Sequence, residues 1–169
     1  MEDRFSTTVS FGSWWITDFN IVPSRFCALR LHRYLFACDS DVTADGFYLT
    51  GPALFEAFDV PLLTRDRRHY FRTDRLSEIT PAELVCHTLL IDDGPRYRTY
   101  CLLLMQQQNI KRTELRERVE HYLPEATIDL RTIVDELIEY VETEGTTTTE
   151  QLPKWEEFKQ TASEYEITV

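Results

Sequence analysis

The feature that most constrains this chain is an amphipathic pattern over residues 127–141. Its apolar side chains recur at intervals of three and one, which lines one side of a helix with 3.6 residues per turn: Leu130, Ile133, Val134, Leu137, Ile138 and Val141. Five acids and one arginine take the opposite side: Asp129, Arg131, Asp135, Glu136, Glu139 and Glu142. An apolar stripe of this kind has to be covered, either by the chain's own core or by a partner.

The length and composition favour one folded domain with a small appendage. The chain has 169 residues, of which 43% are hydrophobic and 12% aromatic, enough for a sizeable core. The longest apolar stretches, such as residues 101–105, fall far short of the roughly 20 residues of a membrane-spanning helix. The acidic start, Met1-Glu2-Asp3-Arg4, has no secretory signal character. We therefore expect an intracellular protein, in a host cell or a virion interior, that is neither secreted nor bound to a membrane.

Strand signals dominate the first 50 residues. Residues 5–19 are rich in β-branched and aromatic side chains, and residues 26–38 alternate between apolar and polar, which predicts one long strand. Asp45-Gly46 supplies a turn, after which residues 47–49 are expected to return as a hairpin partner.

Helix signals dominate from residue 50 onward. Pro52 precedes a short helix over 53–58, and Thr80-Pro81-Ala82-Glu83 has the order of a capping box, which predicts a helix over 81–90. Residues 97–108 suit either helix or strand, and we favour helix. Thr113 is expected to cap a further helix, and Gly145 to close the acidic one. The fold class is thus α+β: an N-terminal antiparallel sheet followed by a mainly helical C-terminal half.

A run of four threonines divides the chain into two expected parts. Residues 1–145 form the α+β domain, and residues 146–169 form a Thr-rich linker with a C-terminal amphipathic helix. Trp155, Phe158 and Tyr165 share one side of that helix, where they either bind a partner or pack on the chain's own body.

The formal net charge of −11 is concentrated at the C-terminal end. Residues 101–169 hold fifteen acids and seven bases. An acidic surface repels phosphate backbones, so it favours a protein partner or self-association and disfavours nucleic acid.

The four cysteines predict buried, reduced thiols: Cys27, Cys38, Cys86 and Cys101. They form no Cys-x-x-Cys pair and have apolar neighbours. A zinc site that uses Cys86 and His87 is the alternative, although short ligand spacings are missing. We expect no metal and no cofactor.

One basic patch gives an alternative function, nucleic-acid binding. Its arginines would contact phosphates and its tyrosine would stack on a base: Arg65, Arg67, Arg68, Tyr70, Arg72 and Arg75. The competing explanation is an ordinary solvated surface whose arginines pair with Asp66, Asp74 and the acidic tail.

Catalytic motifs are lacking in the sequence. It contains no Gly-x-Ser-x-Gly, no phosphate-binding glycine loop and no His-x-x-x-His, and its four histidines are scattered. We expect no enzyme activity, and interpret the chain as an interaction, structural or regulatory protein that binds partners through acidic amphipathic helices.

The order of elements over residues 26–76 resembles the N-terminal domain of the BRO proteins of insect DNA viruses and phages. The shared order is a long strand, a turn, a short aromatic strand at 46–49, a helix at 52–59, and a basic stretch with Tyr70 and Phe71. It is also distantly similar to the N-terminal domain of baculovirus polyhedron-envelope proteins. The resemblance implies a viral or phage source and places a cationic DNA-binding surface at the basic stretch.

Overall fold

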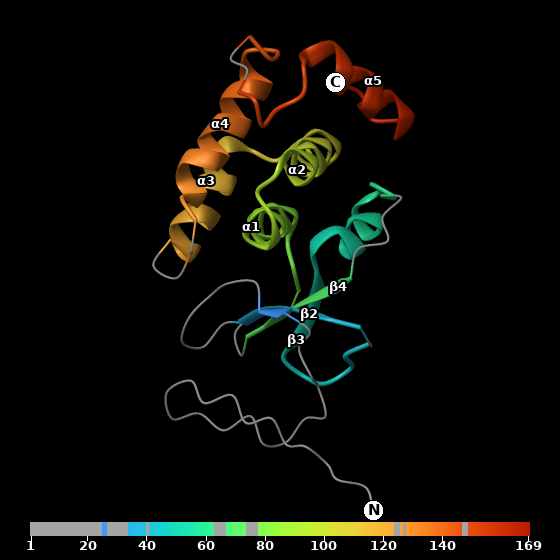
Figure 1. Cartoon of the computed structure of the whole chain (residues 1–169), viewed down its shortest axis with the longest axis vertical. Coiled ribbons are helices and arrows are strands. Elements are labelled where there is room, and N and C mark those ends of the chain that lie inside the picture. The colour runs from blue at the N-terminus through green and yellow to red at the C-terminus, as the bar shows by residue number, and fades with distance from the viewer. Residues whose placement is uncertain are drawn as a thin grey trace, which may run out of the picture.

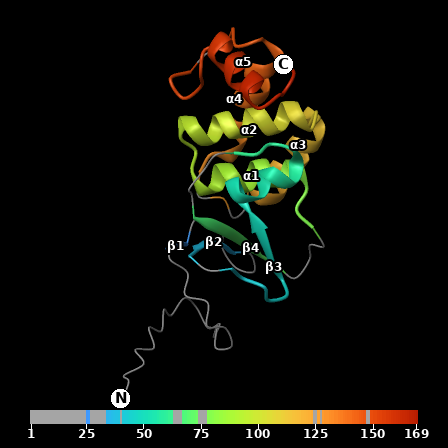
Figure 2. The ribbon, with the colours of Figure 1, turned by 90° about the vertical axis from the view of Figure 1, so that its right-hand side faces the viewer.

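The structure is a computed structural model that describes residues 25–26, 34–39, 41–62, 67–73, 78–123, 126, 128–146 and 149–169. An antiparallel sheet lies at one end, and the helices stack in layers on one of its faces (Figures 1 and 2). This arrangement confirms the α+β fold class. The predictions for residues 5–19, Cys27, Arg65 and Arg75 lie outside the described residues.

Four antiparallel strands form the described sheet, in the spatial order β1-β2-β4-β3. Their bounds are Arg25–Phe26 for β1, Tyr34–Cys38 for β2, Phe47–Thr50 for β3 and Arg68–Arg72 for β4. The prediction of one strand over 26–38 is wrong, because Phe26 and Phe36 belong to two strands that pair antiparallel with each other. The predicted hairpin is also wrong. The strand β4 lies between β2 and β3 and pairs with both.

Alternation along β4 separates two apolar clusters. Phe71 points to the helices and belongs to the main core. Its neighbour Tyr70 belongs to a small cluster with Phe36 and Cys38. Because successive side chains of a strand point to opposite faces, this small cluster lies on the sheet face away from the helices.

The link from β3 to the helical layer is η1, a 3-10 helix over Gly51–Phe58. Gly51 has a φ of 67° and lies so close to Ile91 that a Cβ there would come within 2.6 Å of Ile91 Cδ1. Asp59 ends the helix in the left-handed conformation. The short helix expected after Pro52 is therefore present, in 3-10 rather than α form.

The two central helices are α1, Pro81–Ile91, and α2, Pro95–Gln107. The predicted capping box of α1 is confirmed: Thr80 Oγ1 accepts a hydrogen bond from Glu83 N, and Thr80 N donates to Glu83 Oε2. Nine of the eleven residues of α1 are buried, because the sheet covers one side of it and helices the other (Figure 2). In α2 the five consecutive residues 101–105 are buried, which explains why residues 97–108 show no clear period and still form a helix.

The helices α3, Arg112–Tyr122, and α4, Leu130–Glu142, lie together along one side of this central pair (Figure 1). The predicted cap at Thr113 is wrong, because Lys111 occupies the N-cap position and Thr113 lies inside the first turn. The predicted stripe of α4 is confirmed, with Leu130 to Ile138 buried at the expected spacing. Asp129 caps α4 and accepts hydrogen bonds from the backbone and side chain of Thr132, which lower the pKa of Asp129.

The last helix, α5, covers Trp155–Glu164. Its rings pack on the end of α4: the Tyr140 ring centroid lies 5.4 Å from that of Trp155 and 5.9 Å from that of Phe158. Gly145 permits this approach, since a Cβ there would lie 2.7 Å from Trp155 Cβ. Phe158 and Ala162 are completely buried and share the main core, while a separate 146–169 unit stays a prediction. No helix in the described ranges has the length and apolar character needed to cross a membrane.

Candidate functional site

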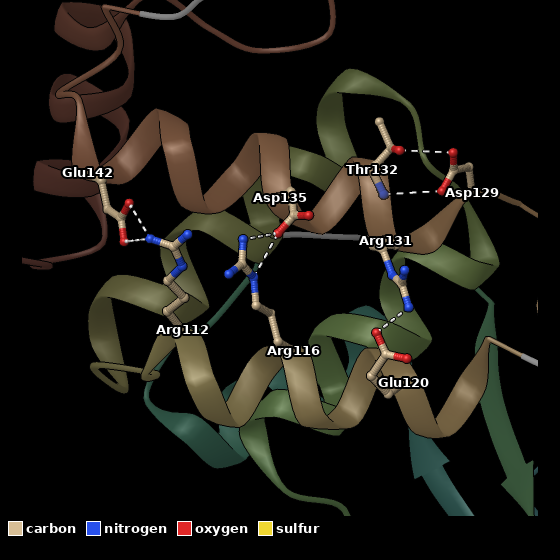
Figure 3. Close-up of polar contacts among 8 residues, drawn as sticks. All are labelled: Arg112, Arg116, Glu120, Asp129, Arg131, Thr132, Asp135 and Glu142. Atoms are coloured by element: carbon tan, nitrogen blue, oxygen red, sulfur yellow. Dashed lines mark hydrogen bonds and ion pairs between the residues drawn. The ribbon is translucent and has the colours of Figure 1, made fainter.

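The most organised polar surface in the described structure is the boundary between α3 and α4. Three arginine–carboxylate pairs cross it: Arg112 with Glu142, Arg116 with Asp135, and Arg131 with Glu120 (Figure 3). Arg112 Nη1 lies 3.1 Å from Glu142 Oε2, and Arg116 Nη2 lies 2.6 Å from Asp135 Oδ1. We call these six residues the charged seam.

The charges of the seam follow from helical spacing. On α3 the residues Arg112, Arg116 and Glu120 stand four apart, and residues four apart share one side of a helix. The facing residues of α4 run in the opposite direction, so each cation meets an acid (Figure 3). Read from the N-terminal end of α3, its charges are plus, plus, minus, and those beside them on α4 are minus, minus, plus.

The seam lies open to solvent. Its six side chains are 41–58% exposed, while Val119 and Val134 below them are buried and form the floor of a shallow hollow. Exposed ion pairs of this kind contribute about 0–1 kcal/mol each to stability. The seam is therefore more notable as a surface pattern than as a source of stability.

A second polar link, between α2 and α4, is more deeply covered. The Arg98 side chain is 8% exposed, and its Nη1 donates to Glu136 Oε2 at 2.6 Å. Arg98 Nε also donates to the carbonyl of Asp93, at 2.7 Å. This arginine joins the start of α2, the loop before it and the middle of α4.

A hydrogen-bonded array links the sheet to the helices inside the core. His87 on α1 is completely buried; its Nδ1 lies 2.9 Å from Thr50 Oγ1, and its Nε2 lies 2.9 Å from the Tyr122 hydroxyl. The Phe71 ring centroid is 4.3 Å from that of His87. Thr50 and Tyr122 are also almost completely buried, so the array stabilises the core and no solvent-borne substrate has access to it.

The described residues of the basic patch lie on β4, in the middle of the sheet, or directly before it. Arg67 and Arg68 form ion pairs with Asp39 and Asp41, which follow β2. Pairing with acids agrees with the solvated-surface explanation, although these acids differ from the ones expected. Tyr70 is 3% exposed, and its hydroxyl accepts a hydrogen bond from Val42 N, so its ring is covered rather than open to a base. Arg72 lies on the same strand and is partly buried.

The expected partner-binding residues of α5 are packed against their own chain. Phe158 is completely buried, and Trp155 and Tyr165 are partly buried against the main core. A partner at this side of α5 would have to displace contacts with Tyr140. Partner binding by these three residues stays a prediction.

The described cysteines are buried and form no disulfide with one another: Cys38, Cys86 and Cys101. Burial is the main cause that raises the pKa of the Cys86 and Cys101 thiols far above the ordinary value, so both stay protonated. Within the described ranges, no three His, Cys, Asp or Glu residues gather in a way that would hold a metal ion.

Sequence reasoning missed both the charged seam and the buried array. The four-residue spacing of Arg112, Arg116 and Glu120, repeated by Arg131 and Asp135, is visible in the sequence, but their pairing required the helix orientation. Nothing local marks Thr50, His87 and Tyr122 as a group, because they are 35 or more residues apart.

A protein-family model described as HVO_2833_C, C-terminal, matches residues 44–167. Comparisons with curated proteins and with solved structures found no significant match. The match says nothing of the BRO resemblance, which stays a prediction. The matched range includes β3, β4 and the five α-helices of the described residues, and so contains the charged seam and the buried array. Because the match extends over well more than half of the chain, the protein belongs to the HVO_2833_C, C-terminal, family.

Proposed function

We propose that this chain is a non-enzymatic protein-binding module whose partner presents a basic surface. The observation that carries the proposal is the acidic end, which we define as the six glutamates of residues 143–169: Glu144, Glu150, Glu156, Glu157, Glu164 and Glu166. All six are exposed, and the only bases in this range are Lys154 and Lys159. This balance produces a negative surface around α5.

The small number of well-exposed apolar side chains supports recognition through charge. Among the described residues, Val169, at 40% exposure, is the one large hydrophobic side chain that is well exposed. An interface normally has an apolar centre. The other large apolar side chains of the described residues are at least partly covered, so we expect charge complementarity to carry most of the recognition. Such binding has a high association rate and weakens as salt is added.

The same charges argue against a phosphate backbone as the partner. A nucleic acid would meet repulsion at the acidic end, and the described arginines Arg67 and Arg68 already face Asp39 and Asp41. Nucleic-acid binding through the basic patch is therefore the weaker of the two proposals.

The test is affinity capture from the native host with the chain as bait, followed by titration of the purified partner at several salt concentrations. A triple variant, Glu150→Gln, Glu164→Gln and Glu166→Gln, removes three exposed charges from the acidic end. The matched control, Asp45→Asn, Glu56→Gln and Asp93→Asn, removes three exposed charges elsewhere.

We expect the acidic-end variant to bind the partner at least tenfold more weakly at low salt and the control to bind like the wild type. Equal affinities for all three proteins would overturn the proposal. A duplex DNA probe is titrated in parallel. Salt-sensitive DNA binding that is lost on Arg67→Ala plus Arg68→Ala would establish the nucleic-acid alternative instead.

A further inference from the structure

We propose that the charged seam binds the charged seam of a second copy of this chain, about a two-fold axis that runs along the seam. The proposal concerns α3 and α4 and not the acidic end, so it does not depend on the function proposed above. The occupant follows from the order of charges and from the hydrogen-bonding capacity that the six side chains leave open.

Charge order makes the seam complementary to itself. A rotation of a half turn about an axis along the seam places α3 of one copy over α4 of the other. Each ion pair keeps its position along the seam, which we call its level. The order plus, plus, minus that Figure 3 shows on α3 then faces the order minus, minus, plus on α4 of the second copy. Every level is attractive, and because the rotation presents two such contacts per level, six new cation–acid contacts form.

The other two-fold axis in the plane of this surface is less favourable. A rotation about an axis across the seam would place Arg116 over Arg116 of the second copy, and Asp135 over its Asp135. At the two ends Arg112 would face Glu120 and Glu142 would face Arg131, so this axis gives four attractive contacts and two repulsive ones at the centre, against six attractive contacts for the axis along the seam. The pattern therefore selects one axis, with α3 antiparallel to α4 of the other copy, as it is to α4 of its own chain.

The ion pairs within one copy leave capacity for these contacts. Arg112 uses only Nη1 to reach Glu142, and Arg131 uses only Nη2 to reach Glu120, although a guanidinium has five N–H donors. Arg116 donates from two nitrogens to one oxygen of Asp135, which leaves the other oxygen without a protein donor among the described contacts. Each side chain thus has room for a second partner on the outward side.

The size of the surface determines how strong the association is. At 1.5 Å per residue, α3 is about 16 Å long, and two adjacent helices are about 20 Å wide, so the surface measures roughly 300 Å² per copy. A standard interface buries about 800 Å² per partner. The dimer is therefore weak, and it forms at high protein concentration and low ionic strength.

The decisive experiment uses two variants that reverse opposite ends of one ion pair, Arg116→Asp and Asp135→Arg. Each places like charges at the middle level, both within the chain and between copies. Sedimentation velocity is recorded at low and high salt for the wild type, for each variant and for their equimolar mixture. Thermal melts check that every protein is folded.

We expect the wild type to dimerise at low salt, each variant to be monomeric, and the mixture to dimerise. In the mixture, the two acids in the middle of the Arg116→Asp copy meet the two arginines in the middle of the Asp135→Arg copy. Complementarity between copies therefore returns while the repulsion within each copy remains. The double variant Arg116→Asp plus Asp135→Arg should dimerise alone. Lys159→Glu, a charge reversal on α5 outside the seam, should dimerise like the wild type.

Two results would overturn the proposal. One is a wild type that stays monomeric at low salt up to the highest soluble concentration. The other is a pair of folded variants whose mixture stays monomeric, or which dimerise individually, since either outcome removes the seam from the interface. If a single reversal prevents folding, Arg116→Gln and Asp135→Asn replace it, with weaker dimerisation expected for each. None of these measurements uses the basic partner, so they leave the proposed function untouched.

Discussion

Removal of Glu136 should destabilise the protein far more than removal of Glu142, although both glutamates lie on α4 and both pair with an arginine. Glu136 forms an ion pair with Arg98, whose side chain is 8% exposed, whereas Glu142 forms an ion pair with Arg112, whose side chain is 49% exposed. The change Glu136→Ala leaves a nearly buried guanidinium without its carboxylate.

The size of this difference follows from burial. Breaking a fully buried ion pair costs about 3–5 kcal/mol. Because Glu136 is 34% exposed and Arg98 keeps its bond to the Asp93 carbonyl, we expect about 2 kcal/mol for Glu136→Ala. For Glu142→Ala we expect about 0.5 kcal/mol or less. Glu136 lies inside α4 and Glu142 is its last residue, so Glu136→Ala gains the full difference in helix propensity and Glu142→Ala also removes a negative charge from the helix C-terminus. Both effects are a few tenths of a kcal/mol and are smaller than the expected difference.

Urea unfolding of both variants measures this difference, and thermal melts give a second readout. For a domain of this size, 1 kcal/mol corresponds to about 2–4 °C, so Glu136→Ala should lower Tm by about 4–8 °C and Glu142→Ala by less than about 2 °C. A cycle with Arg98→Met isolates the pair itself. Equal losses for the two glutamate variants would refute the reasoning that burial of Arg98 controls the cost.

Three further predictions follow from the core. Leu137→Asp places a charge at a fully buried position and should cost several kcal/mol, against about 0.5 kcal/mol or less for Glu139→Gln on the exposed side, and equal Tm values would contradict the assigned helix faces. The buried Tyr140 hydroxyl has no hydrogen-bond partner among the described residues, so Tyr140→Phe should stabilise the protein by about 1 kcal/mol in urea titrations. Burial, and secondarily Glu157, raises the pKa of Tyr140 from 10.0 to about 12. The folded protein therefore resists ionisation of this phenol, and its stability falls as the pH rises from about 10 towards 12. The Phe variant should lack this loss. Cys86 and Cys101 should react slowly with a thiol reagent until the protein unfolds, and elemental analysis should find no stoichiometric zinc.

Patterns within a few residues allowed the helices to be predicted. The capping box at Thr80 and Glu83 and the stripe centred on Leu137 are complete within one helix, so backbone geometry alone gives them meaning. The Thr113 cap failed because a hydroxyl at a helix start is only a preference, and here Lys111 takes the cap position.

The strands show what short-range patterns leave open. Alternation over residues 26–38 is compatible with one strand or with two antiparallel ones, and the sequence between β1 and β2 carried no turn signal that we recognised. The hairpin between β2 and β3 failed because β4, which arrives from farther along the chain, pairs with both of them. Pairing between distant segments depends on how the whole core packs, which no single turn specifies.

The sequence by itself determined the α+β class, the amphipathic faces and the acidic C-terminal end, because each depends on composition or on spacing within one element. Only the tertiary structure decided that Arg116 faces Asp135, that Arg98 reaches Glu136, and that His87 joins Thr50 to Tyr122. The physical reason is that an ion pair or a buried hydrogen bond between elements exists only at contact distance, and contact between distant residues is set by the packing of the entire core.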